Sequence, residues 1–149
     1  LYPSDFPLDD TTNLHGANLK GKEFVKYDLS EKDLGSADFS GSFFSVSSLK
    51  NSDLSGANLE NVIAYATRFD NANLAGANLK GADLMKSFFN GANIDGADFS
   101  DAVLDLAQQK SLCERASGKT AESLKCSALN GDLYIPASLA GENKYNPGS

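Results

Sequence analysis

The feature that most restricts the fold is a five-residue period, clearest between Asn71 and Phe99, which reads NANLAGANLKGADLMKSFFNGANIDGADF. Neither an α-helix, with 3.6 residues per turn, nor an ordinary strand, with a period of two, repeats in this way. Stepping by five from Leu74 in both directions reaches large apolar residues at every position but Ala64. These positions are Leu14, Leu19, Phe24, Leu29, Leu34, Phe39, Phe44, Leu49, Leu54, Leu59, Phe69, Leu74, Leu79, Leu84, Phe89, Ile94, Phe99 and Leu104. Such regularity predicts a repeat architecture.

Small residues form a second periodic class, two positions before the apolar centres, as at Ala57, Ala72 and Ala77. Residues two apart lie on the same side of an extended segment, so both classes should point inward. The Gly, Asn, Ser and Asp residues between segments are turn formers that tolerate positive φ. A chain that turns after each short extended segment, always with the same side inward, must coil.

This pattern, A-(D/N)-L-x-G, resembles the pentapeptide-repeat family over residues 13–104. The resemblance implies a mainly β fold, a right-handed quadrilateral β-helix with four pentapeptides per coil and nearly five coils. Residues twenty apart would then stack on one another. We expect one structural domain with an N-terminal cap at 1–12, the β-solenoid at 13–104, a helical cap at 105–128 and an extended C-terminal tail at 129–149.

The segment after the repeats predicts a helical hairpin. Residues 105–116 place apolar side chains at helical spacing, with Gly118 as a C-terminal stop. A second short helix is expected at 121–126, with Thr120 as its N-cap. The hairpin would cover the last coil, because an open solenoid end exposes unpaired strand edges and an apolar interior.

The only two cysteines, Cys113 and Cys126, fall one on each predicted cap helix. A zinc site would need two further ligands, and the only histidine, His15, lies at the other end of the solenoid. A redox dithiol is disfavoured because C-x-x-C spacing is absent. We therefore predict a structural disulfide, which would stabilise the fold by about 3 kcal/mol in the chain-entropy treatment and would indicate an oxidising compartment.

Outward positions on two faces form columns of Asn and Asp, such as Asn13, Asp33, Asp53, Asn73 and Asn93. Aligned oxygen atoms could bind calcium. We favour turn chemistry on a solvated face, because the Gly/Asp nonapeptide of calcium-binding β-rolls is absent. No metal and no other cofactor is predicted.

One face departs from this polar rule. Around the third inward column, the outward positions carry apolar side chains that we call the apolar strip, namely Val25, Phe43, Val46, Ile63, Tyr65, Met85 and Val103, with Ala66 beside them. Stacked every twenty residues, they should form one contiguous patch, and a patch of this size usually contacts something. Two occupants are open, the C-terminal tail of the chain itself or another protein.

Charge and motif content argue against several functions. A net charge of −7 argues against a nucleic-acid ligand, because phosphate binding needs a Lys/Arg patch. The chain shows no phosphate loop or dinucleotide fingerprint, and His15 has neither a nucleophile nor a carboxylate assigned to it. We predict no enzyme, no catalytic residues and, because no apolar run reaches transmembrane length, no membrane insertion.

The capping segments LCERASG at 112–118 and SLKC at 123–126 resemble those of plant thylakoid-lumen members of the family. This resemblance implies the chloroplast thylakoid lumen, in agreement with the predicted disulfide and with a start at Leu1 that suggests a removed targeting peptide. The expected function is a non-enzymatic protein–protein interaction or scaffold module whose partner is an unknown lumenal protein.

The alternative comes from bacterial members that mimic DNA and regulate gyrase-type topoisomerases. Residues 13–104 carry eight Lys/Arg and twelve Asp/Glu, a net charge of −4. DNA of similar length would carry roughly fourteen charges, at one per 1.7 Å. Those inhibitors resemble longer, dimerising solenoids, whereas the helical cap here favours a monomer.

Overall fold

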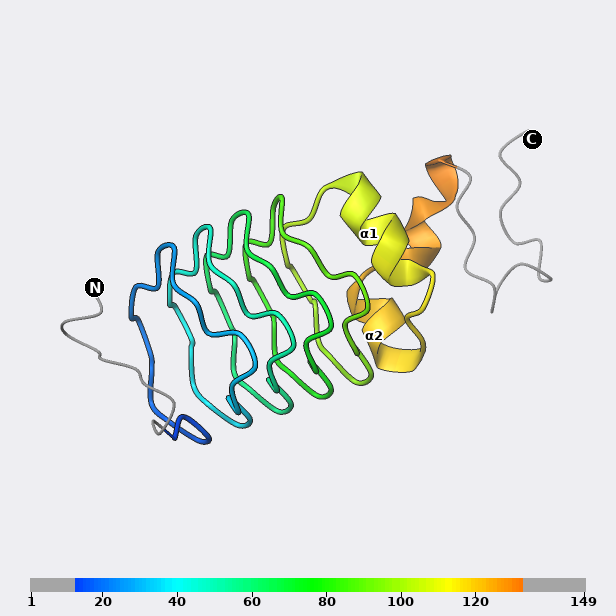
Figure 1. The fold of residues 1–149 in the computed structure, drawn as a ribbon. Helices are drawn as coiled ribbons and strands as arrows, with labels where there is room; N and C mark the ends of the chain where they lie inside the picture. Colours follow the sequence, from blue (N-terminus) through cyan, green and yellow to red (C-terminus); the bar gives the residue numbers. More distant parts are fainter. Residues whose placement is uncertain (1–12, 133–149) are drawn as a thin grey trace.

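The computed structural model describes residues 13–132, which form a stack of coils followed by three short helices (Figure 1). The helices are α1 (Leu106–Cys113), α2 (Gly118–Ser123) and the 3₁₀ helix η1 (Cys126–Asp132). The predicted N-terminal cap at 1–12 and most of the predicted tail lie outside the described residues. No helix within residues 13–132 has both the length and the apolar character needed to cross a bilayer.

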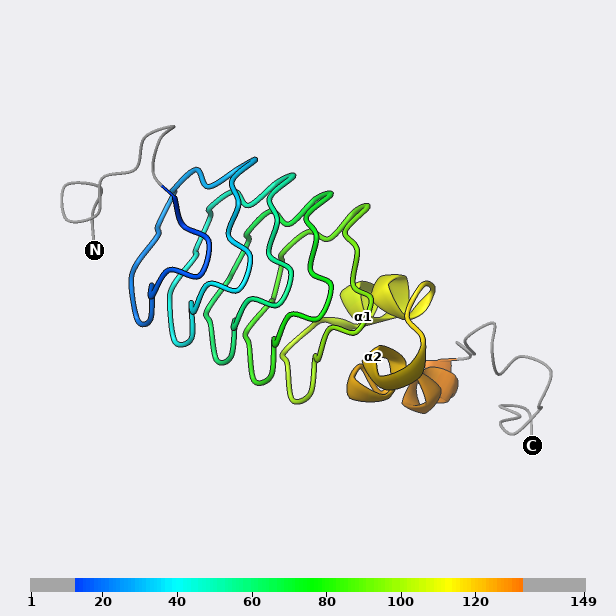
Figure 2. The same ribbon diagram turned by 90° about the horizontal axis from the view of Figure 1, so that it is seen from below.

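Every coil of the solenoid contains twenty residues. Parallel β-bridges join residues twenty apart along the whole stack, from Asn18↔Asp38 to Asp83↔Val103. The prediction of four pentapeptides per coil is confirmed, and Figure 2 shows the coils stacked in register. We number the complete coils 13–32, 33–52, 53–72 and 73–92, and residues 93–104 begin a fifth.

Each side of a coil pairs through a single residue rather than through a strand. Asn58 donates its N–H to the Ala37 carbonyl in the preceding coil (2.9 Å), and Leu59 donates to the Asn78 carbonyl in the following one (2.7 Å). A turn precedes this side of the coil, and in it the Ala57 N–H is bonded to the Leu54 carbonyl (3.0 Å). Since a turn takes up most of each pentapeptide, the sides are too short for extended strands.

The core is the interior of the coils. The apolar centres from Leu14 to Phe99 are buried, as the five-residue period predicts, and the small positions fill the space beside them. Phe24 and Phe44 stack with ring centroids 5.0 Å apart, and so do Phe69 and Phe89. Residues twenty apart are thus in direct contact inside the solenoid, and this contact fixes the register between coils.

Buried hydroxyl groups form a ladder at one corner of the stack. Ser47, Thr67 and Ser87 occupy the small inward position there, and each side chain donates a hydrogen bond to a main-chain carbonyl twenty-three residues earlier. The acceptors are the carbonyl groups of Phe24, Phe44 and Ala64. Because buried polar groups need partners, this ladder satisfies both the hydroxyl groups and the carbonyl groups.

Helix α1 continues the ladder at the C-terminal end. The next carbonyl in the series belongs to Leu84, and Gln108 donates its Nε2–H to it at 2.6 Å. The same amide group reaches the carbonyl of Ser87 at 2.8 Å. Gln108 also completes a capping box with Asp105, which fixes the start of α1. The Gln108 side chain of α1 therefore donates the hydrogen bond that a hydroxyl group of a further coil would donate to the Leu84 carbonyl.

Other cap side chains form hydrogen bonds with further groups of this edge. Arg115 donates from Nη2 to the Phe89 carbonyl (2.7 Å) and from Nε to the Ala92 carbonyl (3.2 Å). The Ser123 hydroxyl accepts the Phe99 N–H at 2.9 Å. These contacts seat the helices on the last coil, where Figure 1 shows them. Unpaired edge groups are thereby given partners.

A disulfide holds the cap together. Cys113, the last residue of α1, is bonded to Cys126, the first residue of η1, with a Cα–Cα distance of 5.6 Å. Both cysteines are buried with Leu112, Leu124 and Leu129 in an extension of the solenoid core.

Three predicted boundaries in the cap are wrong. Gly118 does not stop the first helix but begins α2, and the N-cap of α2 is Ser117 rather than Thr120. Thr120 lies inside α2, where its hydroxyl reaches the Ile94 carbonyl at 3.3 Å. Leu129, expected to start an extended tail, lies in η1 because its side chain is buried in the cap core.

Candidate protein-binding surface

The apolar strip lies on the side of the solenoid whose inward residues are Phe24, Phe44, Ala64 and Leu84. The exposed fractions of Val25, Phe43, Val46, Tyr65 and Val103 run from 42 to 54%. Ile63 and Met85 are half-buried. The coil geometry turns all seven outward because they flank inward positions in the five-residue repeat.

Five of these residues come together on neighbouring coils, and we call them the central patch: Phe43, Val46, Ile63, Tyr65 and Met85. Phe43 and Ile63 are β-bridge partners. The Val46 N–H bonds to the Tyr65 carbonyl at 2.9 Å, and the Ala66 N–H bonds to the Met85 carbonyl at 3.1 Å. Neighbouring coils stand about 4.8 Å apart, so these side chains form one surface.

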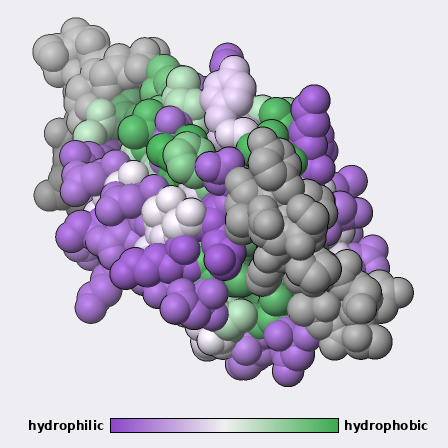
Figure 3. Space-filling model, turned by 90° about the vertical axis from the view of Figure 1, so that its left-hand side faces the viewer, coloured by the Kyte–Doolittle hydropathy of each residue, from purple (hydrophilic) through white to green (hydrophobic). Residues whose placement is uncertain are grey.

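The strip is not contiguous over its full length, which corrects the prediction. The bridged column reads Glu23, Phe43, Ile63, Asp83, Val103, so a carboxylate separates Val103 from the central patch. At the other end, the residue stacked on Val25 in the second coil is Ser45. Figure 3 views the N-terminal end of the solenoid, where hydrophobic and hydrophilic areas lie side by side.

The sequence interpretation missed Phe88, whose exposed fraction is 42%. The other residues of its column, Asp28, Ser48 and Arg68, are polar. A bulky apolar side chain at an otherwise polar outward position is the sequence feature that indicates its exposure. The Arg68 guanidinium lies 4.1 Å from the centroid of the Phe88 ring, a cation–π contact. Asp70 holds that guanidinium in place, with its Oδ2 2.6 Å from both Nε and Nη2 of Arg68.

A groove of about 420 Å³ lies between the fourth coil and α1, beside the central patch. Ala66, Phe88, Phe89 and Leu112 supply its apolar lining, and Lys86 contributes a positive charge. Ala66 directly follows Tyr65 of the central patch, so the groove extends the patch toward the cap. Such a surface can receive apolar side chains of another segment.

The Asn/Asp columns serve the turns. Asp53 Oδ1 accepts the Ser55 N–H at 2.9 Å, and Asn58 Oδ1 accepts the Glu60 N–H at 3.0 Å, and the same contact recurs along both columns. These are Asx turns, in which the side chain imitates a backbone turn. Among residues 13–132 no group of three or more His, Cys, Asp and Glu side chains is placed to hold a metal ion.

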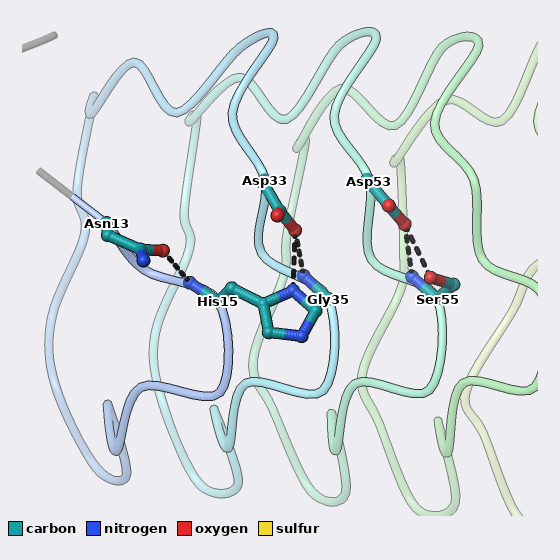
Figure 4. A network of polar contacts seen from close by, with 6 residues as sticks. All are labelled: Asn13, His15, Asp33, Gly35, Asp53 and Ser55. Carbon is teal, nitrogen blue, oxygen red and sulfur yellow. Dashed lines mark hydrogen bonds and ion pairs between the residues drawn. The ribbon is translucent and has the colours of Figure 1, made fainter. Parts of the chain in front are cut away.

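His15, which the sequence interpretation left without a carboxylate, has one. Its Nδ1 lies 2.9 Å from Oδ1 of Asp33 in the second coil (Figure 4). This hydrogen bond and the Asp33 charge raise the pKa of His15, and the same hydrogen bond lowers the pKa of Asp33. The twenty-residue coil brings positions 15 and 33 together, which inspection of His15 alone could not reveal.

Comparison with known proteins gives a single family. The family model described as Pentapeptide repeats matches residues 28–63 and 65–104 in eight copies. No curated protein matches the chain by sequence.

Solved structures add further similarities. The pentapeptide repeat protein Rfr23 of the cyanobacterium Cyanothece 51142 is 22% identical, with a TM-score of 0.53 over 63% of this chain and 84% of that one. This likeness concerns the fold and supports a right-handed quadrilateral β-helix. A pentapeptide repeat protein from the Arabidopsis thaliana thylakoid lumen is 30% identical over 76% of this chain and 88% of that one, with a TM-score of 0.34. QnrB1, a plasmid-mediated fluoroquinolone resistance protein, is 19% identical over 68% of each chain, with a TM-score of 0.28.

Proposed function

Because this chain belongs to the pentapeptide-repeat family, we propose that it is a non-enzymatic protein-binding module of the chloroplast thylakoid lumen. The observation that carries the proposal is the central patch. Its aromatic and aliphatic side chains stand on the outside of a solenoid whose core is already filled by the inward residues. Aromatic residues and methionine are enriched at protein interfaces, whereas an isolated exposed apolar residue means little.

The backbone at Val46 supports a role for the patch outside folding. Val46 has a φ of 55°, and at the equivalent turn position eight other pentapeptides carry glycine. A β-branched residue is unfavourable in this left-handed region, at a cost on the order of 1–3 kcal/mol. Its side chain remains exposed among residues 13–132, so burial there does not offset the strain. Such strain is typical of functional sites.

The location in the lumen rests on two observations. The Arabidopsis protein that is 30% identical comes from that compartment. The disulfide between Cys113 and Cys126 needs an oxidising environment to persist. We infer a lumenal protein as the partner, because the patch presents apolar and aromatic groups flanked by charges rather than a basic surface suited to nucleic acid.

Affinity capture from thylakoid-lumen extract tests the proposal. The wild type is compared with a Phe43→Ser/Ile63→Ser/Tyr65→Ser variant, and circular dichroism verifies that the variant keeps its fold. The matched control carries three serine substitutions on another side of the solenoid, Lys20→Ser, Glu60→Ser and Lys80→Ser. We expect a protein that the wild type and the control retain and the patch variant loses. Equal retention by all three proteins would remove the patch as the binding site.

A photo-crosslinking residue placed at Tyr65, and separately at Lys80, supplies a second readout. The captured protein should crosslink to position 65 and not to position 80. Crosslinks confined to position 80 would locate the interface on another face.

A further inference from the structure

A small polar site links the first two coils of the solenoid. His15 lies in a turn of the first coil, and its ring extends toward the second coil to reach Asp33, with Nδ1 and Oδ1 2.9 Å apart (Figure 4). The backbone N–H of His15 is fixed by the Asn13 side chain at 3.0 Å. A main-chain hydrogen bond from Gly16 to the Gly35 carbonyl, 2.8 Å long, joins the same two turns.

Gly35 provides the space that the imidazole ring occupies. A Cβ at this position would lie 3.0 Å from both Cε1 and Nδ1 of His15, which is closer than side chains normally approach. The φ of Gly35 lies outside the left-handed region, so the backbone itself does not require glycine here. The missing side chain therefore serves the position of the histidine.

The site also places negative charges on neighbouring coils. Asp33 is the β-bridge partner of Asp53 in the third coil, and like charges opposite one another destabilise such a pair. Among residues 13–132, the titratable groups that act on His15 are these two carboxylates, and both favour its protonated form. His15 is the single histidine of the chain. A protonated imidazole would offset the repulsion in this column.

We propose that His15 and Asp33 form a pH-dependent clamp that fastens the first coil to the second when the imidazole is protonated. Gly35 is the positioning residue that admits the ring, and Asp33 is the acceptor. The first coil suits such a device, because a solenoid coil contacts only its neighbours and coils near an end of a stack open more readily than internal ones.

The sign of the pH dependence follows from the two pKa shifts. The folded state raises the pKa of His15 above its ordinary 6.5, so its stabilisation is complete below that value and is lost as pH rises through the raised pKa. The folded state lowers the pKa of Asp33 below its ordinary 3.8, so its stabilisation is present above that value and is lost as pH falls through the lowered pKa. The clamp is therefore closed in mild acid and opens toward alkaline pH.

An NMR titration of the His15 ring in the full chain tests the geometry. In the wild type the pKa should lie above 6.5, and Asp33→Asn should bring it back toward that value. Gly35→Ala should do the same although the carboxylate remains, because the added methyl group displaces the ring. An ordinary pKa in the wild type, or one that Asp33→Asn leaves unchanged, would overturn the clamp.

Amide hydrogen exchange tests the consequence for the coil. After correction for the intrinsic rate, protection of the Gly16 N–H should fall by about two- to fivefold between pH 5.5 and pH 8, the size expected for an exposed ion pair. His15→Gln should abolish this dependence. The N–H of Gly76, at the equivalent position in the fourth coil and bonded to the Asp95 carbonyl, is the internal control. The clamp is refuted if Gly16 protection is independent of pH, or if it changes equally in His15→Gln.

Discussion

At the scale of single residues, the five-residue repeat requires a positive φ in every turn, and not every residue found there favours that conformation. The third residue of each turn is left-handed, and glycine or asparagine fills most of these positions. Of the seven other residues found there, Val46 is the one that is β-branched. We predict that Val46→Asn raises the free energy of unfolding by about 1 kcal/mol, because asparagine tolerates this conformation and valine does not. Partner capture should weaken at the same time. Equilibrium denaturation in urea and the capture assay measure the two effects.

The reverse substitution at an equivalent turn supplies the control. Asn61 has a φ of 58° and lies outside the central patch, so Asn61→Val should lower stability by a similar amount and leave capture intact. If Val46→Asn destabilises the protein instead, the valine side chain contributes to folding and the strain argument for the patch fails.

At the scale of elements, the helical cap replaces the coil that the solenoid lacks. Arg115 is the test case, since its guanidinium serves the carbonyl groups of Phe89 and Ala92 together, and partial burial lowers its pKa. We predict that Arg115→Ala lowers the free energy of unfolding by about 1.5 kcal/mol, the lower end of the range for hydrogen bonds to charged groups, because water can reach this site. Arg115→Lys should recover part of the loss, since an ammonium group lacks the planar fork. Wild-type stability in both variants would show that the guanidinium does not hold the cap.

The cap also shows where sequence interpretation stops. The period of five assigned the inward residues and the turns because each repeat meets the same local rule. Glycine and threonine are common at more than one position near a helix end, so the sequence does not fix whether Gly118 and Thr120 lie outside or inside a helix. Contacts with the last coil, such as that of Thr120 with the Ile94 carbonyl, place both residues in α2. The contact between His15 and Asp33 is likewise not evident from the sequence, because only the stacking of the coils brings the two residues together. The apolar strip is shorter than predicted because Glu23, Ser45 and Asp83 interrupt it.

At the scale of the whole molecule, charge separates the proposed function from DNA mimicry. The net charge of −4 over residues 13–104 is far below the roughly fourteen charges of a DNA segment of similar length. We predict that the full chain, even in large molar excess, leaves the supercoiling activity of DNA gyrase unchanged. Inhibition that falls as salt is raised would indicate an electrostatic DNA mimic and would contradict the proposal.

The hydroxyl ladder has a consequence for how a molecule of this kind changes length. Every coil presents the same carbonyl acceptor twenty residues after the last one, and Gln108 needs only the final member of that series. Duplication or deletion of an internal coil of twenty residues therefore leaves the helical cap with the same main-chain partners. An insertion of five residues between Phe43 and Ile63 would turn the cap by a quarter of the circumference and move these two residues apart. Growth in whole coils is the only change of length that this architecture absorbs without rebuilding its ends.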